Sequence, residues 1–181
     1  MFSVITKYYR MPILIAITLI VVMTALNTVR EPLQIAAIIL GAFIGIFVFD
    51  LEFIIYAYFL EPQRDFSRTL ATFLKHHDYK NALSFMNFNS GEIQEKTLNS
   101  ALFQIAVAAL SVFVISSDTF ILAKALVLSV FANSIYKFSE YYFNDKLNEW
   151  FWALKEKPNK SGAMLYITVV CLVFVYCLYI Y

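Results

Sequence analysis

Charged residues are scarce in this chain. Only 15% of its 181 residues are Asp, Glu, Lys or Arg, whereas 61% are hydrophobic and 18% are aromatic. Such an apolar composition excludes an ordinary soluble domain and predicts a polytopic membrane protein. The net charge of +1 leaves no concentrated basic face, so we expect no nucleic-acid partner. The expected partners are the lipid bilayer and either another membrane protein or a second copy of the chain.

Cysteine and histidine are rare as well, with two residues of each. Cys171 and Cys177 lie in the last apolar segment at a spacing typical of neither a disulfide framework nor a metal site, and we expect buried free thiols. His76 and His77 are adjacent in a polar string. This favours a solvated surface over a ligand pair, because neighbouring side chains on a helix point apart.

Long hydrophobic runs, by contrast, are abundant. Crossing the ~30 Å hydrocarbon layer takes about 20 helical residues, and five segments reach or approach that length. None has the strict alternation of a barrel strand, so we expect an all-α fold. The chain is then a single integral membrane domain, 1–181, with predicted spans at 11–29, 33–60, 98–115, 119–136 and 163–181.

The basic residues gather on one side of these spans. They precede the first span, populate the connection between the second and third, and follow the fourth, whereas Arg30 lies on the opposite side. The positive-inside rule therefore places the N-terminus and both longer connections in the cytoplasm. The uncharged C-terminus is then outside.

Both longer connections have a helical pattern. The cytoplasmic loop 61–96 is too short for a domain and reads as short helices, one of them capped by Asp78. In the second connection, 139–156, apolar residues recur at helical spacing, which predicts an interfacial amphipathic helix in the headgroup plane. The recurring residues are Phe143, Leu147, Trp150, Phe151 and Leu154.

Small residues mark one helix face. Gly41 and Gly45 form a G-x-x-x-G pattern within the second predicted span. The pattern lets a neighbouring helix approach closely. We expect this neighbour to belong to the same chain, with a second copy as the alternative.

Two carboxylates lie inside the apolar run 33–60. A carboxylate at membrane depth costs at least a few kcal/mol, so it usually faces a partner, a cavity or an ion. Asp50 lies about 26 Å along a helix from Leu33 at ~1.5 Å per residue, near the cytoplasmic boundary. Residues two apart on a helix point to nearly opposite sides, so we expect Asp50 to face inward and Glu52 to reach the headgroups. Counting along the other spans predicts a polar cluster at this depth of Asp50, Glu52, Asn99, Asn133 and Lys137.

Four strings around these residues resemble the landmarks of a known family. They are FDLEFIIY at 49–56, TLNSALFQ at 97–104, SS at 116–117 and LSVFANSI at 128–135. In order, spacing and membrane depth they are similar to the landmarks of the YdjM-type metal-dependent hydrolase-like proteins of the bacterial inner membrane. Those proteins carry D-x-D-H, H-[ST] and H-x-x-x-D motifs. The resemblance covers about residues 33–152 and implies a multi-pass protein of the bacterial cytoplasmic (inner) membrane.

The ligands that the resemblance implies are largely replaced here. Asp50 matches the first acid and Glu52 replaces the second. Imidazole is a strong ligand for zinc, whereas an amide oxygen is weak and a phenyl ring is none, so we expect no cofactor. If a divalent metal does bind, Asp50 and Glu52 are its expected ligands. The three histidine positions and the closing aspartate hold Phe53, Asn99, Asn133 and Lys137.

Three functional interpretations follow. The first is a catalytically degenerate hydrolase-like protein, a pseudoenzyme that acts as a scaffold or partner subunit, with the Lys137 ammonium paired to the acids in place of a metal. The second is a divergent metal-dependent hydrolase of a lipid or headgroup, with further ligands from Asn99, His76 or His77. The third is a small transporter. A transporter needs a polar path through the bilayer centre, and the helix midsections carry only scattered serine and threonine, which argues against this interpretation. We expect the first.

Overall fold

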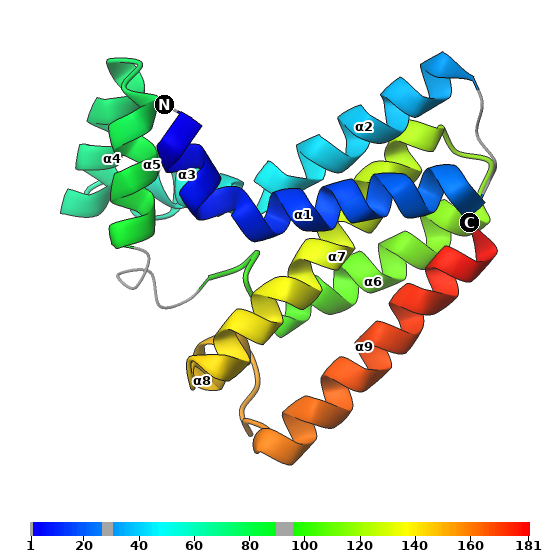
Figure 1. Ribbon diagram of the computed structural model, residues 1–181. Coiled ribbons are helices and arrows are strands. Elements are labelled where there is room, and N and C mark those ends of the chain that lie inside the picture. The colour runs from blue at the N-terminus through cyan, green and yellow to red at the C-terminus, as the bar shows by residue number, and fades with distance from the viewer. Residues whose placement is uncertain (1, 27–30, 90–95) are drawn as a thin grey trace.

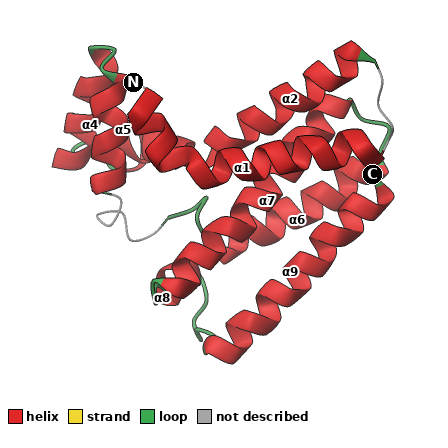
Figure 2. Cartoon of the chain, in the orientation of Figure 1, coloured by secondary structure: helices red, strands yellow, loops and turns green. Residues whose placement is uncertain are grey.

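The computed structural model describes residues 2–26, 31–89 and 96–181, and every regular element within these ranges is a helix (Figures 1 and 2). The all-α prediction is therefore confirmed. The chain folds into a bundle of long helices with a pair of short helices at one end (Figure 1). The long helices are α1 (Phe2–Leu26), α2 (Pro32–Phe47), α6 (Ala101–Ser116), α7 (Ile121–Phe143) and α9 (Lys160–Ile180).

Four helical segments of the described chain are long and apolar enough to cross a membrane. Five were predicted. The remaining helix, α6, has 16 residues and is about 24 Å long at ~1.5 Å per residue, which is shorter than the ~30 Å hydrocarbon layer. Residues 27–29 of the first predicted span lie outside the described residues. The four segments are Tyr9–Leu26, Pro32–Leu60, Ile121–Phe143 and Lys160–Ile180.

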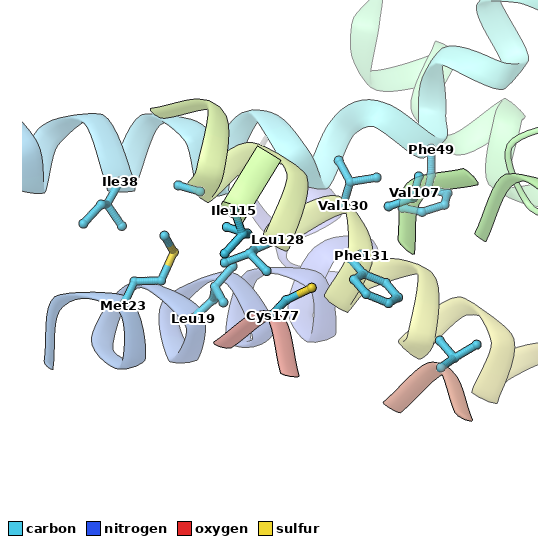
Figure 3. Packing of buried hydrophobic residues seen from close by; sticks show 12 residues of the cluster. Leu19, Met23, Ile38, Phe49, Val107, Ile115, Leu128, Val130, Phe131 and Cys177 are labelled. Carbon is cyan, nitrogen blue, oxygen red and sulfur yellow. The ribbon is translucent and has the colours of Figure 1, made fainter. Parts of the chain in front are cut away.

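Helix α7 is the centre of the bundle, because it packs against α1, α2, α6 and α9. The core between these helices is almost entirely aliphatic and aromatic (Figure 3). Phe131 and Leu128 of α7 are fully buried in it, and Cys177 of α9 is buried there as a free thiol, as predicted. Cys171 is also free, but it is only partly buried.

Helices α2 and α7 approach each other closely at the glycine pattern. A Cβ atom on Gly41 would lie 2.4 Å from the Leu122 carbonyl oxygen, and one on Gly45 would lie 2.6 Å from the Ser129 Cβ. The Ser129 hydroxyl donates a hydrogen bond of 2.6 Å to the Ala42 carbonyl oxygen. The prediction that the glycines seat a helix of the same chain is confirmed.

The helical winding changes just beyond α2. A 3₁₀ turn, η1 (Val48–Asp50), a short α-helix, α3 (Leu51–Ile55), and a π turn, η2 (Tyr56–Leu60), follow without a break in the helical path. Such changes of winding inside a helix often mark functional positions. Here they fall on the two carboxylates.

Two short helices follow this segment, as predicted for the loop 61–96. They are α4 (Asp65–Lys75) and α5 (Tyr79–Phe88), and their apolar faces pack on each other and on η2. The Asp78 carboxylate caps α5 by accepting a hydrogen bond of 3.3 Å from the Asn81 N–H, which confirms the predicted cap. Residues 90–95 of this loop lie outside the described residues.

The interfacial helix predicted at 139–156 is wrong. Helix α7 continues to Phe143 and ends in a tight cap, in which Asp145 adopts the left-handed conformation (φ 56°). The Lys146 N–H bonds back to the Tyr141 carbonyl oxygen, which terminates the helix. Only a four-residue helix, α8 (Leu147–Trp150), follows. The apolar stripe is real, but most of it packs inward, against Phe138, Tyr141, Ala101, Ala163 and Tyr166.

Candidate functional site

The predicted polar cluster lies at the end of the bundle where α1 and α6 begin and where α3 and α7 end. Below, we call this end the polar end. Its side chains come from four parts of the chain: Asp50 from η1, Glu52 from α3, Asn99 from the segment before α6, and Asn133 and Lys137 from α7. The structure brings the five predicted residues to this end, and it adds residues that sequence reasoning missed.

Glu52 is the most buried acid of the polar end, with 5% of its surface exposed. Its Oε1 accepts a hydrogen bond of 2.8 Å from the Leu98 N–H, and its Oε2 accepts one of 2.5 Å from the Asn99 Nδ2. The expectation that Glu52 reaches the headgroups is therefore wrong. It assumed protein on one side of the helix only, whereas the segment before α6 covers the opposite side.

Asp50 is half-buried and points to a different neighbour. The Tyr9 hydroxyl of α1 donates a hydrogen bond to the Asp50 Oδ2, and the Tyr9 ring packs against Phe47 with the ring centroids 5.4 Å apart. Asp50 thus faces inward, as predicted. Tyr9 had no sequence signal, because nothing in its spacing relates it to an acid 41 positions later.

Lys137 has a direct partner on its own helix. Its Nζ lies 2.8 Å from the Glu140 Oε2, and about a third of each side chain is exposed. The Tyr136 hydroxyl donates to the other oxygen of Glu140 at 2.8 Å. Lys137 therefore pairs with Glu140 rather than directly with Asp50 or Glu52. The spacing of three between Lys137 and Glu140 could have indicated this pair.

Lys96 is a buried cation with 8% of its surface exposed. Its Nζ donates a hydrogen bond of 3.2 Å to the Tyr141 hydroxyl, and the Trp152 Nε1 donates one of 2.9 Å to the Lys96 carbonyl oxygen. Burial lowers the pKa of the Lys96 ammonium below its ordinary value, while the charges of Glu149 and Glu52 oppose this effect. Sequence reasoning placed Lys96 in a loop and missed this role.

Asn133 is 2% exposed, and its Nδ2 donates to the Ser129 carbonyl oxygen at 2.9 Å. Its Oδ1 has no hydrogen-bond partner among the described residues. Asn133 lines a hollow of about 40 Å³ together with Tyr9, Asp50 and Lys137. A hollow of this size has room for water.

A larger polar cavity of about 250 Å³ opens beside these groups. Its wall carries three ammonium groups and three carboxylates, so the formal charges balance. Phe53, a position where the predicted resemblance implies a histidine, also lies in the wall. The charged lining residues are Asp50, Glu140, Glu149, Lys96, Lys137 and Lys146.

The carboxylates of the polar end accept hydrogen bonds from other groups of the chain. Both Glu52 oxygens hold N–H donors, and Asp50 accepts from Tyr9. His76 and His77 lie exposed in the turn between α4 and α5, outside the cavity wall. Within the described part of the chain, no three His, Cys, Asp or Glu side chains gather as a metal site requires.

Comparison with known protein families, curated proteins and solved structures found no match for this chain. The resemblance to the YdjM-type proteins therefore stays a prediction.

Proposed function

We propose that this chain is a non-catalytic, multi-pass protein of the bacterial cytoplasmic membrane that acts as a scaffold or partner subunit. Its N-terminus is cytoplasmic and its C-terminus lies outside. The polar end then lies at the cytoplasmic boundary of the bilayer. The observation that carries the proposal is the use of both Glu52 oxygens by N–H donors of the chain itself.

Further bonds of the same kind support this proposal. Tyr9 joins α1 to the end of η1, and Lys96 joins the segment before α6 to α7 through Tyr141. Trp152 then joins the segment after α8 to Lys96. The polar side chains of the polar end thus hold helices and connections together. This is a structural role for what we interpret as the remnant of a metal site.

A divergent hydrolase of a lipid or headgroup is the second candidate. The observation that favours it is the cavity of about 250 Å³ with Asp50 and Asn99 in its wall. Such an enzyme would bind the reacting atoms of its substrate in this cavity, whereas a scaffold needs only the hydrogen bonds around the cavity.

Metal content and assembly state of the wild type and of Asp50→Asn separate the two candidates. For a scaffold, we expect the purified wild type to hold no stoichiometric zinc, manganese, iron or nickel by elemental analysis. We also expect native electrophoresis of solubilised membranes to show a complex larger than the 20.9 kDa chain. One metal ion per chain that is lost in Asp50→Asn at an unchanged unfolding temperature would overturn the proposal. A chain that is monomeric in gently solubilised membranes would refute the partner role.

A further inference from the structure

An apolar groove runs along the outside of the bundle between α1 and α9, with α7 as its floor. It has a volume of about 370 Å³, within the range of ligand pockets of roughly 300–1,000 Å³. Figure 1 shows α1 and α9 close together near the C-terminus and spread apart toward α8. The lining residues of the groove are Met11, Leu14, Ile15, Thr18, Leu19, Val22, Ala132, Tyr136, Phe174 and Leu178.

The chemistry of the groove suits a hydrocarbon chain. The Thr18 hydroxyl is turned back to the Leu14 carbonyl oxygen at 2.9 Å, so it presents no free donor. Met11 and Leu14 are each 50% exposed, which leaves the groove open from the side. From Met11 to Val22 the groove extends about 16 Å at ~1.5 Å per residue, which is roughly half of the ~30 Å hydrocarbon layer. This is the depth of one leaflet.

The mouth of the groove adjoins the polar cavity on one turn of α7. Tyr136 lines the groove and the next residue, Lys137, lines the cavity. Glu140 accepts hydrogen bonds from both side chains, each at 2.8 Å. A molecule with an apolar tail in the groove would thus meet a paired cation and anion at its polar end.

We propose that this groove holds one acyl chain of a phospholipid from the adjacent leaflet, with a zwitterionic phosphoethanolamine headgroup at Lys137 and Glu140 on the rim of the polar cavity. The cavity wall carries equal numbers of cations and anions, so a net-neutral zwitterion adds no uncompensated charge to a half-buried site. The phosphate pairs with lysine, and the primary ammonium donates to carboxylate. A trimethylated ammonium has no N–H donor and an anionic headgroup has no cation, so both bind less well. This inference rests on the membrane location in the proposed function but not on the scaffold role.

The test is the lipid that stays with the protein. We expect the wild type, purified in mild detergent, to retain one phosphatidylethanolamine per chain in native mass spectrometry. Its unfolding temperature should rise on adding phosphatidylethanolamine more than on adding phosphatidylcholine or phosphatidylglycerol, and not with soluble phosphoethanolamine. Glu140→Gln should reduce the preference for phosphatidylethanolamine over phosphatidylcholine, because one carboxylate that receives the ammonium is lost.

Groove variants locate the acyl chain. Ala132→Phe fills the floor of the groove and should abolish lipid retention, whereas Ala109→Phe on the exposed face of α6 should leave it unchanged. Leu14→Trp fills the groove from the α1 wall, so the test survives if Ala132→Phe fails to fold. Retained lipids that mirror the bulk membrane composition, or full retention in both groove variants, would overturn the proposal.

Discussion

Glu52→Ala is the sharpest test of the structural role of the polar end. The substitution removes the acceptor for the Leu98 N–H and the Asn99 Nδ2. Each buried donor left without a partner costs about 1–3 kcal/mol, and loss of a buried charge offsets part of this cost. We therefore expect the free energy of unfolding to fall by about 3 kcal/mol. For a chain of this size that lowers the unfolding temperature by roughly 6–12 °C.

Thermal unfolding in one detergent at a fixed scan rate measures this effect, because irreversible unfolding makes the midpoint depend on the rate. Glu31→Ala is the matched control: Glu31 is exposed, and its carboxylate accepts a hydrogen bond of 2.8 Å from the Gln34 side chain. Such a surface change should stay within ~0.5 kcal/mol. Glu52→Gln should lie between the two, because Asn99 can rotate its amide to face the new one. If Glu52→Ala unfolds no earlier than Glu31→Ala, the carboxylate does not hold the helices together and our reasoning fails.

Three further perturbations test the fold and the charges. Gly45→Leu places a side chain where a Cβ already lies 2.6 Å from Ser129, so we expect no monodisperse protein on size-exclusion chromatography; a normal elution profile would contradict the close packing. Tyr9→Phe keeps the ring contact but removes the hydrogen bond to Asp50, so it should cost about 1 kcal/mol in thermal unfolding; a cost of zero would mean that this bond does not stabilise α1. Burial lowers the pKa of Lys96 in the folded chain, so the unfolded chain binds more protons and stability rises with pH toward ~10.4. The unfolding midpoint should therefore climb as the pH rises toward ~10.4, and Lys96→Met should lose that increment; an equal climb in both would assign it to another group.

The sequence was sufficient for the all-α fold and for bringing part of the polar cluster together. Hydropathy located five segments, four of which are long enough to cross a membrane, and counting residues from a span end predicted that Asp50, Asn99 and Lys137 share one level, where they line one cavity. Depth along a helix follows from a fixed rise per residue, so it is readable without tertiary information. The glycine pattern was readable for a similar reason, because a missing side chain invites a close neighbour.

Contacts around each polar group were not readable in this way. Glu52 was predicted to reach the headgroups because its hydrogen-bond partners lie in the segment before α6. That segment is irregular, so no periodic pattern in the sequence indicates where it packs. Tyr9 and Lys96 meet Asp50 and Tyr141 through packing between distant helices. The stripe around Trp150 was identified correctly but placed on the wrong surface, because the left-handed turn at Asp145 folds it back onto the bundle.

The contact between α2 and α7 has a consequence for the order in which the chain matures. The Ser129 hydroxyl that reaches the Ala42 carbonyl comes 87 residues later in the sequence. At about 5–20 residues per second of synthesis, α2 exists for roughly 4–17 s before its partner emerges from the ribosome. During that interval the glycine face of α2 cannot pack against α7. Nascent chains shorter than about residue 130 should therefore be the forms most vulnerable to capture by proteases or by the wrong helix.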